Sequence, residues 1–145
     1  MRMMKNGVPV QIHVHNVIQQ GDDQNVIEFW TTGYYSTKDG ATYIQYEEEH
    51  DFGHVKSLLK WTENELYIMR SGAVKMRQRF IEQQQTISNY ETQYGTFRLA
   101  TLTKSLGIST NQTDNRGTLK VHYDLNIGEE KHVHTLTIEY KEEQS

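Results

Sequence analysis

The sequence predicts an all-β fold, an antiparallel meander of about eight to ten strands that closes into a barrel. The first observation is that apolar and polar residues alternate with a period of two along almost every segment, with no convincing helical period. The second is the recurrence of turn signals at short intervals, such as Lys38-Asp39-Gly40. The third is the length, because 145 residues suit a single domain, 1–145, whose strands can enclose a real core.

The first half of the chain reads as consecutive strands over 8–18, 26–35, 41–49, 54–62 and 65–72. In the first of these, Val10, Ile12 and Val14 share one face. The segment 26–35 has apolar residues on both faces, so its orientation stays open. The faces predicted to point inward in the later segments are Ile44 and Tyr46, then Val55, Ser57, Leu59 and Trp61, then Leu66, Ile68 and Arg70.

The segment 74–80 alternates strictly, with Val74, Met76, Gln78 and Phe80 on one parity and Lys75, Arg77 and Arg79 on the other. A basic parity can follow a phosphate backbone, but nucleic-acid recognition usually adds more basic charge and stacking aromatics. The chain has a net charge of −4. We therefore interpret the basic parity as a solvated outer face, neutralised by Glu82 or by a strand that carries Glu91, and we expect no nucleic-acid partner.

The second half continues with strands over 86–92 and 94–103, and then with a long loop over 104–117 that has room for a single helical turn. The chain closes on a hairpin formed by 117–127 and 132–141. If the apolar faces of these two strands coincide, Ile127 should oppose His132 and Leu125 should oppose His134.

Several stretches resemble the YwiB-like family of small, uncharacterised bacterial proteins. They are RSGAVKMRQRF at 70–80, NYETQYGTF at 89–97, ATYIQYEEEHDFGHVKSLLKW at 41–61 and GTLKVHYDLNIG at 117–128. The similarity is one of pattern rather than of a chemical motif. It implies a lipocalin-like barrel of the calycin type in a bacterial cytoplasm, with no activity assigned, so no catalytic or binding residue is carried over. This chain has Gln93 before Tyr94-Gly95, where the family pattern has proline, so that turn is expected to be less rigid.

The composition excludes several classes of chemistry. Zero cysteines exclude disulfides, thiol nucleophiles and thiolate metal sites. No Gly-x-Ser-x-Gly elbow and no glycine-rich phosphate loop occurs, so nucleophilic catalysis and nucleotide binding find no support. The amino-terminal segment lacks the apolar core of a signal peptide, and no apolar run is long enough to span a membrane. We expect a cytoplasmic protein with no membrane partner.

Two His-Val-His pairs offer metal-ligand geometry, since residues at i and i+2 of a strand share a face. They would become neighbours if the first and last strands pair. However, His13 and His15 fall on the polar parity of their strand, whereas His132 and His134 fall on the apolar one. Glu139 has the wrong parity to join the second pair. We expect no metal site and no cofactor.

The segment 46–54 gathers four carboxylates with His50 and His54 around a turn. A divalent cation or a general acid–base pair could use such a cluster. Acidic runs at hairpin tips more often keep an edge soluble, and we interpret this one in that way.

The inward parity itself suggests a ligand site. The residues expected to project toward one interior are Tyr35, Tyr46, Arg70, Met76, Gln78, Phe80 and Tyr90. Packed cores rarely place arginine and glutamine beside tyrosine and methionine, because an unpaired buried polar group costs about 1–3 kcal/mol. One explanation is a cavity with an apolar wall and polar anchors, in which Arg70 pairs with a carboxylate or phosphate. The other is that Arg70 reaches water at the barrel mouth while the aromatic residues fill the core.

We predict a barrel, more consistent with a binding protein than with an enzyme, that holds a small, partly apolar molecule in its interior. Two alternatives remain open. One is a protein–protein interaction module, monomeric or homo-oligomeric, that uses an edge strand or the 104–117 loop. The other is a metal-dependent protein that uses the histidine pairs. Fold alone does not decide between them.

Overall fold

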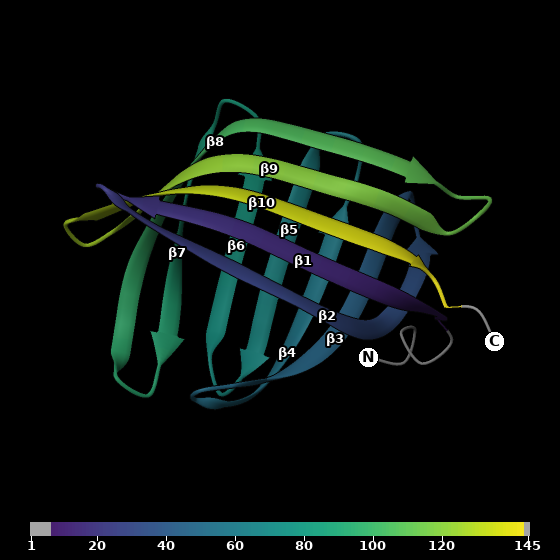
Figure 1. The fold of residues 1–145 in the computed structure, drawn as a ribbon, viewed down its shortest axis with the longest axis horizontal. Helices are drawn as coiled ribbons and strands as arrows, with labels where there is room; N and C mark the ends of the chain where they lie inside the picture. Colours follow the sequence, from purple (N-terminus) through teal and green to yellow (C-terminus); the bar gives the residue numbers. More distant parts are fainter. Residues whose placement is uncertain (1–6, 144–145) are drawn as a thin grey trace.

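The chain forms a closed barrel of ten antiparallel strands in a computed structural model (Figure 1). The structure describes residues 7–143, apart from the side chain of His50. The strands are β1 (Val8–Gln20), β2 (Asp23–Lys38), β3 (Ala41–His50), β4 (Gly53–Trp61), β5 (Glu65–Gly72), β6 (Lys75–Ile81), β7 (Gln85–Thr92), β8 (Gly95–Asn111), β9 (Arg116–Ile127) and β10 (Glu130–Glu142). The predicted all-β fold and antiparallel closed barrel are confirmed. Within the described residues no helix is long and apolar enough to cross a bilayer.

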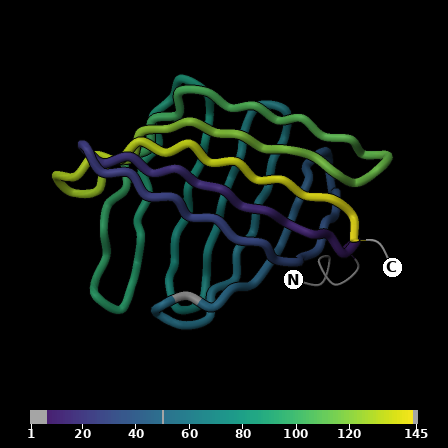
Figure 2. Tube along the Cα trace, in the orientation of Figure 1, coloured from purple at the N-terminus to yellow at the C-terminus, as the bar shows by residue number. Residues whose placement is uncertain are grey.

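The barrel closes because β1 pairs with both β2 and β10. Ile12 lies opposite Thr31 on one side and opposite Tyr140 on the other. Figure 2 shows the first and last strands of the chain side by side. All other neighbours in the sheet are also neighbours in the sequence, joined by short turns such as Asp39-Gly40, whose positive φ angles of 53° and 81° suit a tight hairpin.

The predicted loop over 104–117 is wrong. β8 runs to Asn111 and β9 begins at Arg116, so only a short turn separates them. The register shifts between Thr103 and Ser105, which marks a β-bulge. The extra residue moves the inward parity from Thr103 to Leu106. The alternation therefore breaks at this point of the sequence although the strand continues.

The predicted register of the last hairpin is displaced by two residues. Ile127 pairs with Glu130 rather than with His132, and Leu125 pairs with His132 rather than with His134. The connection is the tight turn Gly128-Glu129, in which Gly128 has a φ of 60°. The faces were assigned correctly, because a shift of two residues preserves the parity of every side chain.

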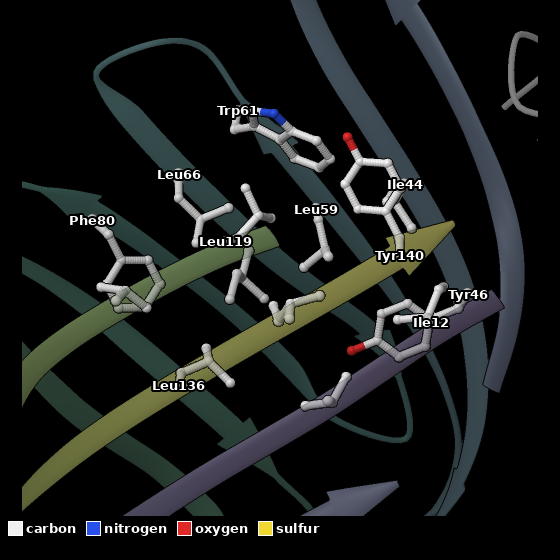
Figure 3. Packing of buried hydrophobic residues seen from close by; sticks show 14 of the residues in the cluster. Ile12, Ile44, Tyr46, Leu59, Trp61, Leu66, Phe80, Leu119, Leu136 and Tyr140 are labelled. Carbon is white, nitrogen blue, oxygen red and sulfur yellow. The ribbon is translucent and has the colours of Figure 1, made fainter. Parts of the chain in front are cut away.

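One end of the barrel is filled by inward apolar side chains (Figure 3). The ring centroids of Tyr35 and Trp61 lie 5.6 and 5.5 Å from that of Tyr140. Ile12, Ile44, Leu59, Leu66, Leu119 and Phe80 are among the largest side chains removed from solvent. Full burial of such a side chain contributes about 1.5–3 kcal/mol, so this packed end supplies much of the stabilisation.

The β2 strand is paired on both edges only along its second half. Its contacts with β3 run from Gly33 to Lys38, whereas residues 23–32 pair with β1 alone. Along this half, Val26 and Ile27 are 53% and 49% exposed although they point to opposite faces. In this segment, which has apolar residues on both faces, the missing neighbour leaves side chains of both faces exposed.

The ladder between β6 and β7 is also incomplete. Only Lys75 pairs with Glu91 and Met76 with Tyr90. Nearer the turn, the hydroxyl of Thr86 donates to the carbonyl oxygen of Arg79 at 2.8 Å, in place of a main-chain bond. The wall of the barrel is therefore held by few main-chain contacts at this position.

Candidate functional site

Polar side chains occupy the inner wall beyond the packed end. They come from strands on opposite sides of the barrel and, because side chains alternate between faces, all of them point inward. These residues are Asn16, Ser57, Arg70, Gln78, Thr101, Thr103, His132 and His134. Buried polar groups in folded proteins are usually hydrogen-bonded, so each of them requires an explanation.

Arg70 is the cation of this polar end. It lies on β5, opposite Ser57 on β4 and Met76 on β6. Its positive charge acts on the phenols of both Tyr46 on β3 and Tyr123 on β9. Burial raises the pKa of each phenol, and the arginine partly offsets that effect.

No carboxylate forms an ion pair with Arg70 among the described residues, where its guanidinium instead hydrogen-bonds the phenol of Tyr46. Its Nε is buried and makes no hydrogen bond. Arg70 is half-buried, so its partial desolvation is not offset by a carboxylate of the described residues. This geometry is the expected one if the partner is a molecule that the chain itself does not provide.

His134 faces the same space from β10. Its ring stacks on that of Tyr123 with centroids 4.6 Å apart and an interplanar angle of 9°. Burial and the neighbouring His132 lower the pKa of His134 to about 4, so the ring is neutral near pH 7. Nδ2 of Asn16 lies 3.2 Å from Nδ1 and donates to it, which leaves the proton of the ring on Nε2.

Four of the unpartnered buried atoms can act as donors. They are Nε of Arg70, Nε2 of His134 and the hydroxyls of Ser57 and Thr103. Arg70 and Ser57 face each other across neighbouring strands, while Thr103 pairs with Tyr123, which in turn pairs with His134. A site rich in unpaired donors favours an acceptor-rich group such as a carboxylate.

Apolar side chains that remain partly exposed surround the approach to this polar end. Ile27 is 49% exposed and Phe97 is 43% exposed, although both point inward. Phe29, Met76 and Tyr90 are half-buried and pack against the core. An apolar wall beside a few polar anchors is the usual composition of a small-molecule site.

A groove of about 840 Å³ reaches the same region from outside, along β3–β7. Inward Ser57, Arg70 and Met76 line it together with outward Lys75 and Arg77. It lies where β6 and β7 share few main-chain contacts. Arg70 is therefore not sealed inside the barrel.

The residues predicted to project inward all do so, but they lie at different depths. Arg70, Met76 and Tyr90 are half-buried, while Tyr46 is buried beside Arg70. The remaining ones belong to the packed interior. Tyr35 stacks on Tyr140, and the ring centroids of Phe80 and Tyr123 lie 4.7 Å apart. Gln78 is hydrogen-bonded to Thr101.

Sequence reasoning missed part of the polar end. Asn16, Thr101, Thr103 and Tyr123 were not singled out, and His134 was considered only as a metal ligand. A polar residue on an otherwise apolar parity was the available signal. Such a residue could not be assigned to a site from its own strand alone, because these residues meet only when β1, β8, β9 and β10 lie side by side.

The basic parity of β6 points outward, as predicted. Lys75 lies opposite Glu91 on β7, and Nε of Arg79 is 2.7 Å from a carboxylate oxygen of Glu65. Glu82 does not neutralise the stripe, since its carboxylate accepts a hydrogen bond from the amide of Leu106.

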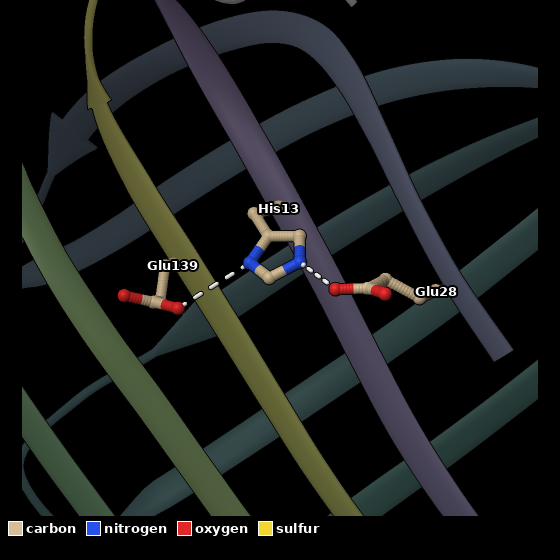
Figure 4. A network of polar contacts seen from close by, with 3 residues as sticks. All are labelled: His13, Glu28 and Glu139. Atoms are coloured by element: carbon tan, nitrogen blue, oxygen red, sulfur yellow. Dashed lines mark hydrogen bonds and ion pairs between the residues drawn. The ribbon is translucent and has the colours of Figure 1, made fainter. Parts of the chain in front are cut away.

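The two histidine pairs do not meet. β1 and β10 pair with His15 opposite Thr137 and with His134 opposite Ile18. His13 instead lies on the outer wall, where its two nitrogens contact Glu28 at 2.7 Å and Glu139 at 3.3 Å (Figure 4). These contacts raise the pKa of His13.

The acidic turn near residue 50 is arranged in the same way. His54 contacts Glu47 at 2.6 Å and Glu49 at 2.8 Å, and both hydrogen bonds raise its pKa. The side chain of His50, which the sequence places in this cluster, lies outside the described part of the structure. Among the described residues no three histidine or carboxylate side chains converge as metal ligands.

Comparison with known proteins gives the same architecture. Residues 12–142 match the family model described as "Domain of unknown function (DUF1934)". The chain belongs to the DUF1934 family. It is 43% identical over 139 residues to the uncharacterized beta-barrel protein YwiB of Bacillus subtilis (strain 168), covering 95% of this chain and 96% of that protein. The crystal structure of the ywiB protein from Bacillus subtilis superposes with a TM-score of 0.89 at 40% identity, covering 99% of this chain and 97% of that one.

The resemblance to the YwiB-like family is therefore confirmed, and the DUF1934 barrel described above has a solved counterpart. Neither the family description nor the name of the relative gives an activity. The inward donors and the partly exposed apolar wall are the observations from which a function of this DUF1934 barrel can be argued.

Proposed function

We propose that the barrel binds a small, partly apolar molecule with an anionic end, most simply a carboxylate. The observation that carries this proposal is the inward guanidinium of Arg70, whose Nε has no partner and which forms no ion pair with a carboxylate of the described residues. A bound carboxylate would supply the missing charge and could accept two parallel hydrogen bonds from the guanidinium.

The donor set supports an anion over a neutral molecule. The hydroxyl of Ser57 lies next to Arg70, and the Nε2 proton of His134 faces the interior from the opposite wall. A carboxylate or phosphate has enough lone pairs to accept from several of these groups at once. The pKa of about 4 keeps His134 a neutral donor at pH 7.

The apolar part of the ligand would lie against Phe29, Met76 and Tyr90, whose side chains are half-buried. Tyr46 would border the anionic end beside Arg70. Tyr35, Gln78 and Phe80 would bound the site from the packed side rather than touch solvent. In this proposal the protein is a non-enzymatic carrier or sensor in a bacterial cytoplasm.

Binding is tested with the fluorescent dye 8-anilinonaphthalene-1-sulfonate, which joins apolar rings to an anionic group. We expect saturable one-site binding, displacement by decanoate and much weaker displacement by decanol. Arg70→Met should weaken decanoate binding by at least about tenfold, since a charged hydrogen bond contributes about 1.5–3 kcal/mol. Arg98→Met is the matched control, because Arg98 points outward on β8 and does not line the groove that reaches Arg70.

Equal decanoate affinity of the Arg70→Met and Arg98→Met proteins would contradict the proposal, as would a wild-type protein that binds neither dye nor decanoate. The natural ligand is then sought by mass spectrometry of freshly purified protein, native and denatured. A co-purifying acidic compound released on unfolding is the expected result.

A further inference from the structure

A second groove, of about 720 Å³, lies on the outer wall of the barrel and has no part in the interior site. It crosses the strands in the order β2, β1, β10, β9 and β8, which are consecutive in the sheet. One row of outward side chains runs along it, formed by Trp30, His13, Glu139, Thr118 and Ser109. The register pairs each of these residues with the next.

Trp30 forms one end of the row and is 70% exposed. An indole exposed to this extent offers its face to a ligand, and tryptophan is enriched at binding surfaces. The next strands provide a polar surface beside it, which is the arrangement of an aromatic platform with hydrogen-bonding groups around it.

The platform is held in place by its neighbours. The ring of His13 stacks under Trp30 with centroids 4.4 Å apart and an interplanar angle of 16°. Glu28 and Glu139 hold the two nitrogens of that imidazole from either side (Figure 4). One face of the indole is thus supported by residues of β1, β2 and β10. Because the ring is already held in place, binding a ligand costs little side-chain conformational entropy.

The opposite wall of the groove is the end of the β8–β9 hairpin. It is tied to β10 by a hydrogen bond from Nδ2 of Asn115 to a carboxylate oxygen of Glu142, 2.6 Å long. A second row of polar side chains lies beside the first and is formed by Gln11, Lys141, Arg116 and Asn111. Hydroxyl, amide, carboxylate and basic groups are therefore all within the groove.

We propose that this groove binds a neutral saccharide chain, with one sugar ring stacked on Trp30. A pyranose ring has an apolar C–H face for the indole and hydroxyls that both donate and accept, which matches the mixed lining. Positive Arg116 and Lys141 are balanced by Glu139 and by Asp114, which lies 3.8 Å from Arg116. A charge-balanced groove gives no preference for a highly charged partner.

The extent of the row indicates the size of the ligand. Adjacent strands are about 4.7–4.9 Å apart, so the row from β2 to β8 is about 19 Å long. That length fits several linked sugar units better than a single one. The proposal does not depend on the interior site, since its residues point outward from other strands than β5.

The test uses maltohexaose, cellohexaose and chitohexaose as probes, with adenosine as a planar-ring comparison. The chain has two tryptophans, and Trp61 is 3% exposed, so the two indole N–H signals in a ¹H–¹⁵N spectrum report separately on the groove and on the core. We expect at least one oligosaccharide, at millimolar concentration, to shift the signal of Trp30 and leave that of Trp61 in place.

Trp30→Ala should weaken binding of that oligosaccharide by at least about tenfold, or about 1.4 kcal/mol. Trp30→Phe should retain part of it. Tyr34→Ala is the matched control, since Tyr34 lies on the same face of β2, is 48% exposed and does not line the groove. Arg70→Met should leave saccharide binding unchanged, which separates this result from that of the interior site.

Three outcomes would overturn the proposal. In the first, none of the oligosaccharides shifts the signal of Trp30. In the second, adenosine shifts it and the oligosaccharides do not, which would assign the platform to a planar base. In the third, Trp30→Ala and Tyr34→Ala bind the oligosaccharide equally well.

Discussion

Nε2 of Gln78 donates a hydrogen bond to Oγ1 of Thr101, 3.1 Å away in the interior of the barrel. The two residues lie on β6 and β8, which are separated in the sheet by β7. The bond therefore spans the position where β6 and β7 share only two residue pairs. A side-chain contact here joins strands that the main chain holds weakly.

Gln78→Leu should lower the free energy of unfolding by about 1–3 kcal/mol, because Thr101 would lose its partner in a buried position. Adding Thr101→Val should restore part of the loss, since both partners are then apolar. Urea denaturation of the two single variants and the double variant measures the coupling. Strictly additive effects would show that this bond does not stabilise the fold.

The stability of the barrel should depend on the protonation of His134. Its pKa is about 4 in the folded protein and about 6.5 in an unfolded chain, so the unfolded state binds more protons between these values. Stability is therefore complete above pH 6.5 and falls as the pH is lowered toward 4, by about 3 kcal/mol in all. His134→Phe should remove this part of the pH dependence while keeping a ring on Tyr123.

His13 provides a control, because its pKa is shifted in the direction opposite to that of His134. Its pKa is raised by hydrogen bonds to Glu28 and Glu139, so its contribution is present below pH 6.5 and is lost as the pH rises through the raised value. His13→Gln should therefore lower the free energy of unfolding below pH 6.5. At pH values above the raised pKa of His13, the variant and the wild type should be equally stable in this respect. Chemical denaturation over a pH series distinguishes the two histidines, and identical profiles for both variants would contradict the assignment.

Gly33 should not tolerate a side chain. A Cβ at this position would lie 2.3 Å from the carbonyl oxygen of Gln45 and 2.9 Å from Cδ1 of Ile12, so the two strands would have to separate. We expect Gly33→Ala to cost at least about 1–3 kcal/mol, as overpacked core positions do.

Gly107→Ala is the matched control for this change. A Cβ at Gly107 would come no closer than 4.0 Å to the oxygen of Lys120, and its φ lies outside the left-handed region. The substitution should leave the melting temperature unchanged or raise it slightly, because alanine restricts the unfolded chain. Equal losses of melting temperature in both variants would show that the close contacts at Gly33 are not the reason why this position requires glycine.

The break between β6 and β7 should be visible in hydrogen exchange. Beyond Met76, the amides of β6 that point toward β7 have no ladder partner there. Those amides should exchange with solvent much faster than the amides of Thr118 to Val121 on β9, which pair with both β8 and β10. Uniform protection along the barrel would mean that β6 and β7 are held together as firmly as the other pairs.

The faces of the strands could be predicted because each depends only on local alternation. Val10, Ile12 and Val14 point inward and Lys75, Arg77 and Arg79 point outward, as the period of two requires. The extent of β8 could not be predicted, because a bulge shifts the parity within the strand. The register of the last hairpin failed for a related reason, since apolar faces fix a strand pair only to within two residues.

The polar end of the barrel interior, where we propose a site, could be predicted only in part. Arg70, Met76 and Tyr90 were singled out because their polar or aromatic character stands out on an inward parity, and the structure places them on the inner wall. The role of His134 depends on Asn16, which is 118 positions away in the sequence. The outer groove depends likewise on Trp30 and Ser109 lying in one row. Such long-range pairings are set by closure of the barrel and leave no local signal.

The pairing of β1 with β10 also sets an order of events during synthesis. The first strand leaves the ribosome long before its final neighbour exists, because Val10 pairs with Glu142. Until then one edge of β1 is exposed, and closure must wait for nearly the whole chain, which is the slow, non-local step expected of high contact order. Any sheet that forms before the last strand is released therefore has an unpaired edge at β1, and we expect a chaperone that shields such edges to bind it.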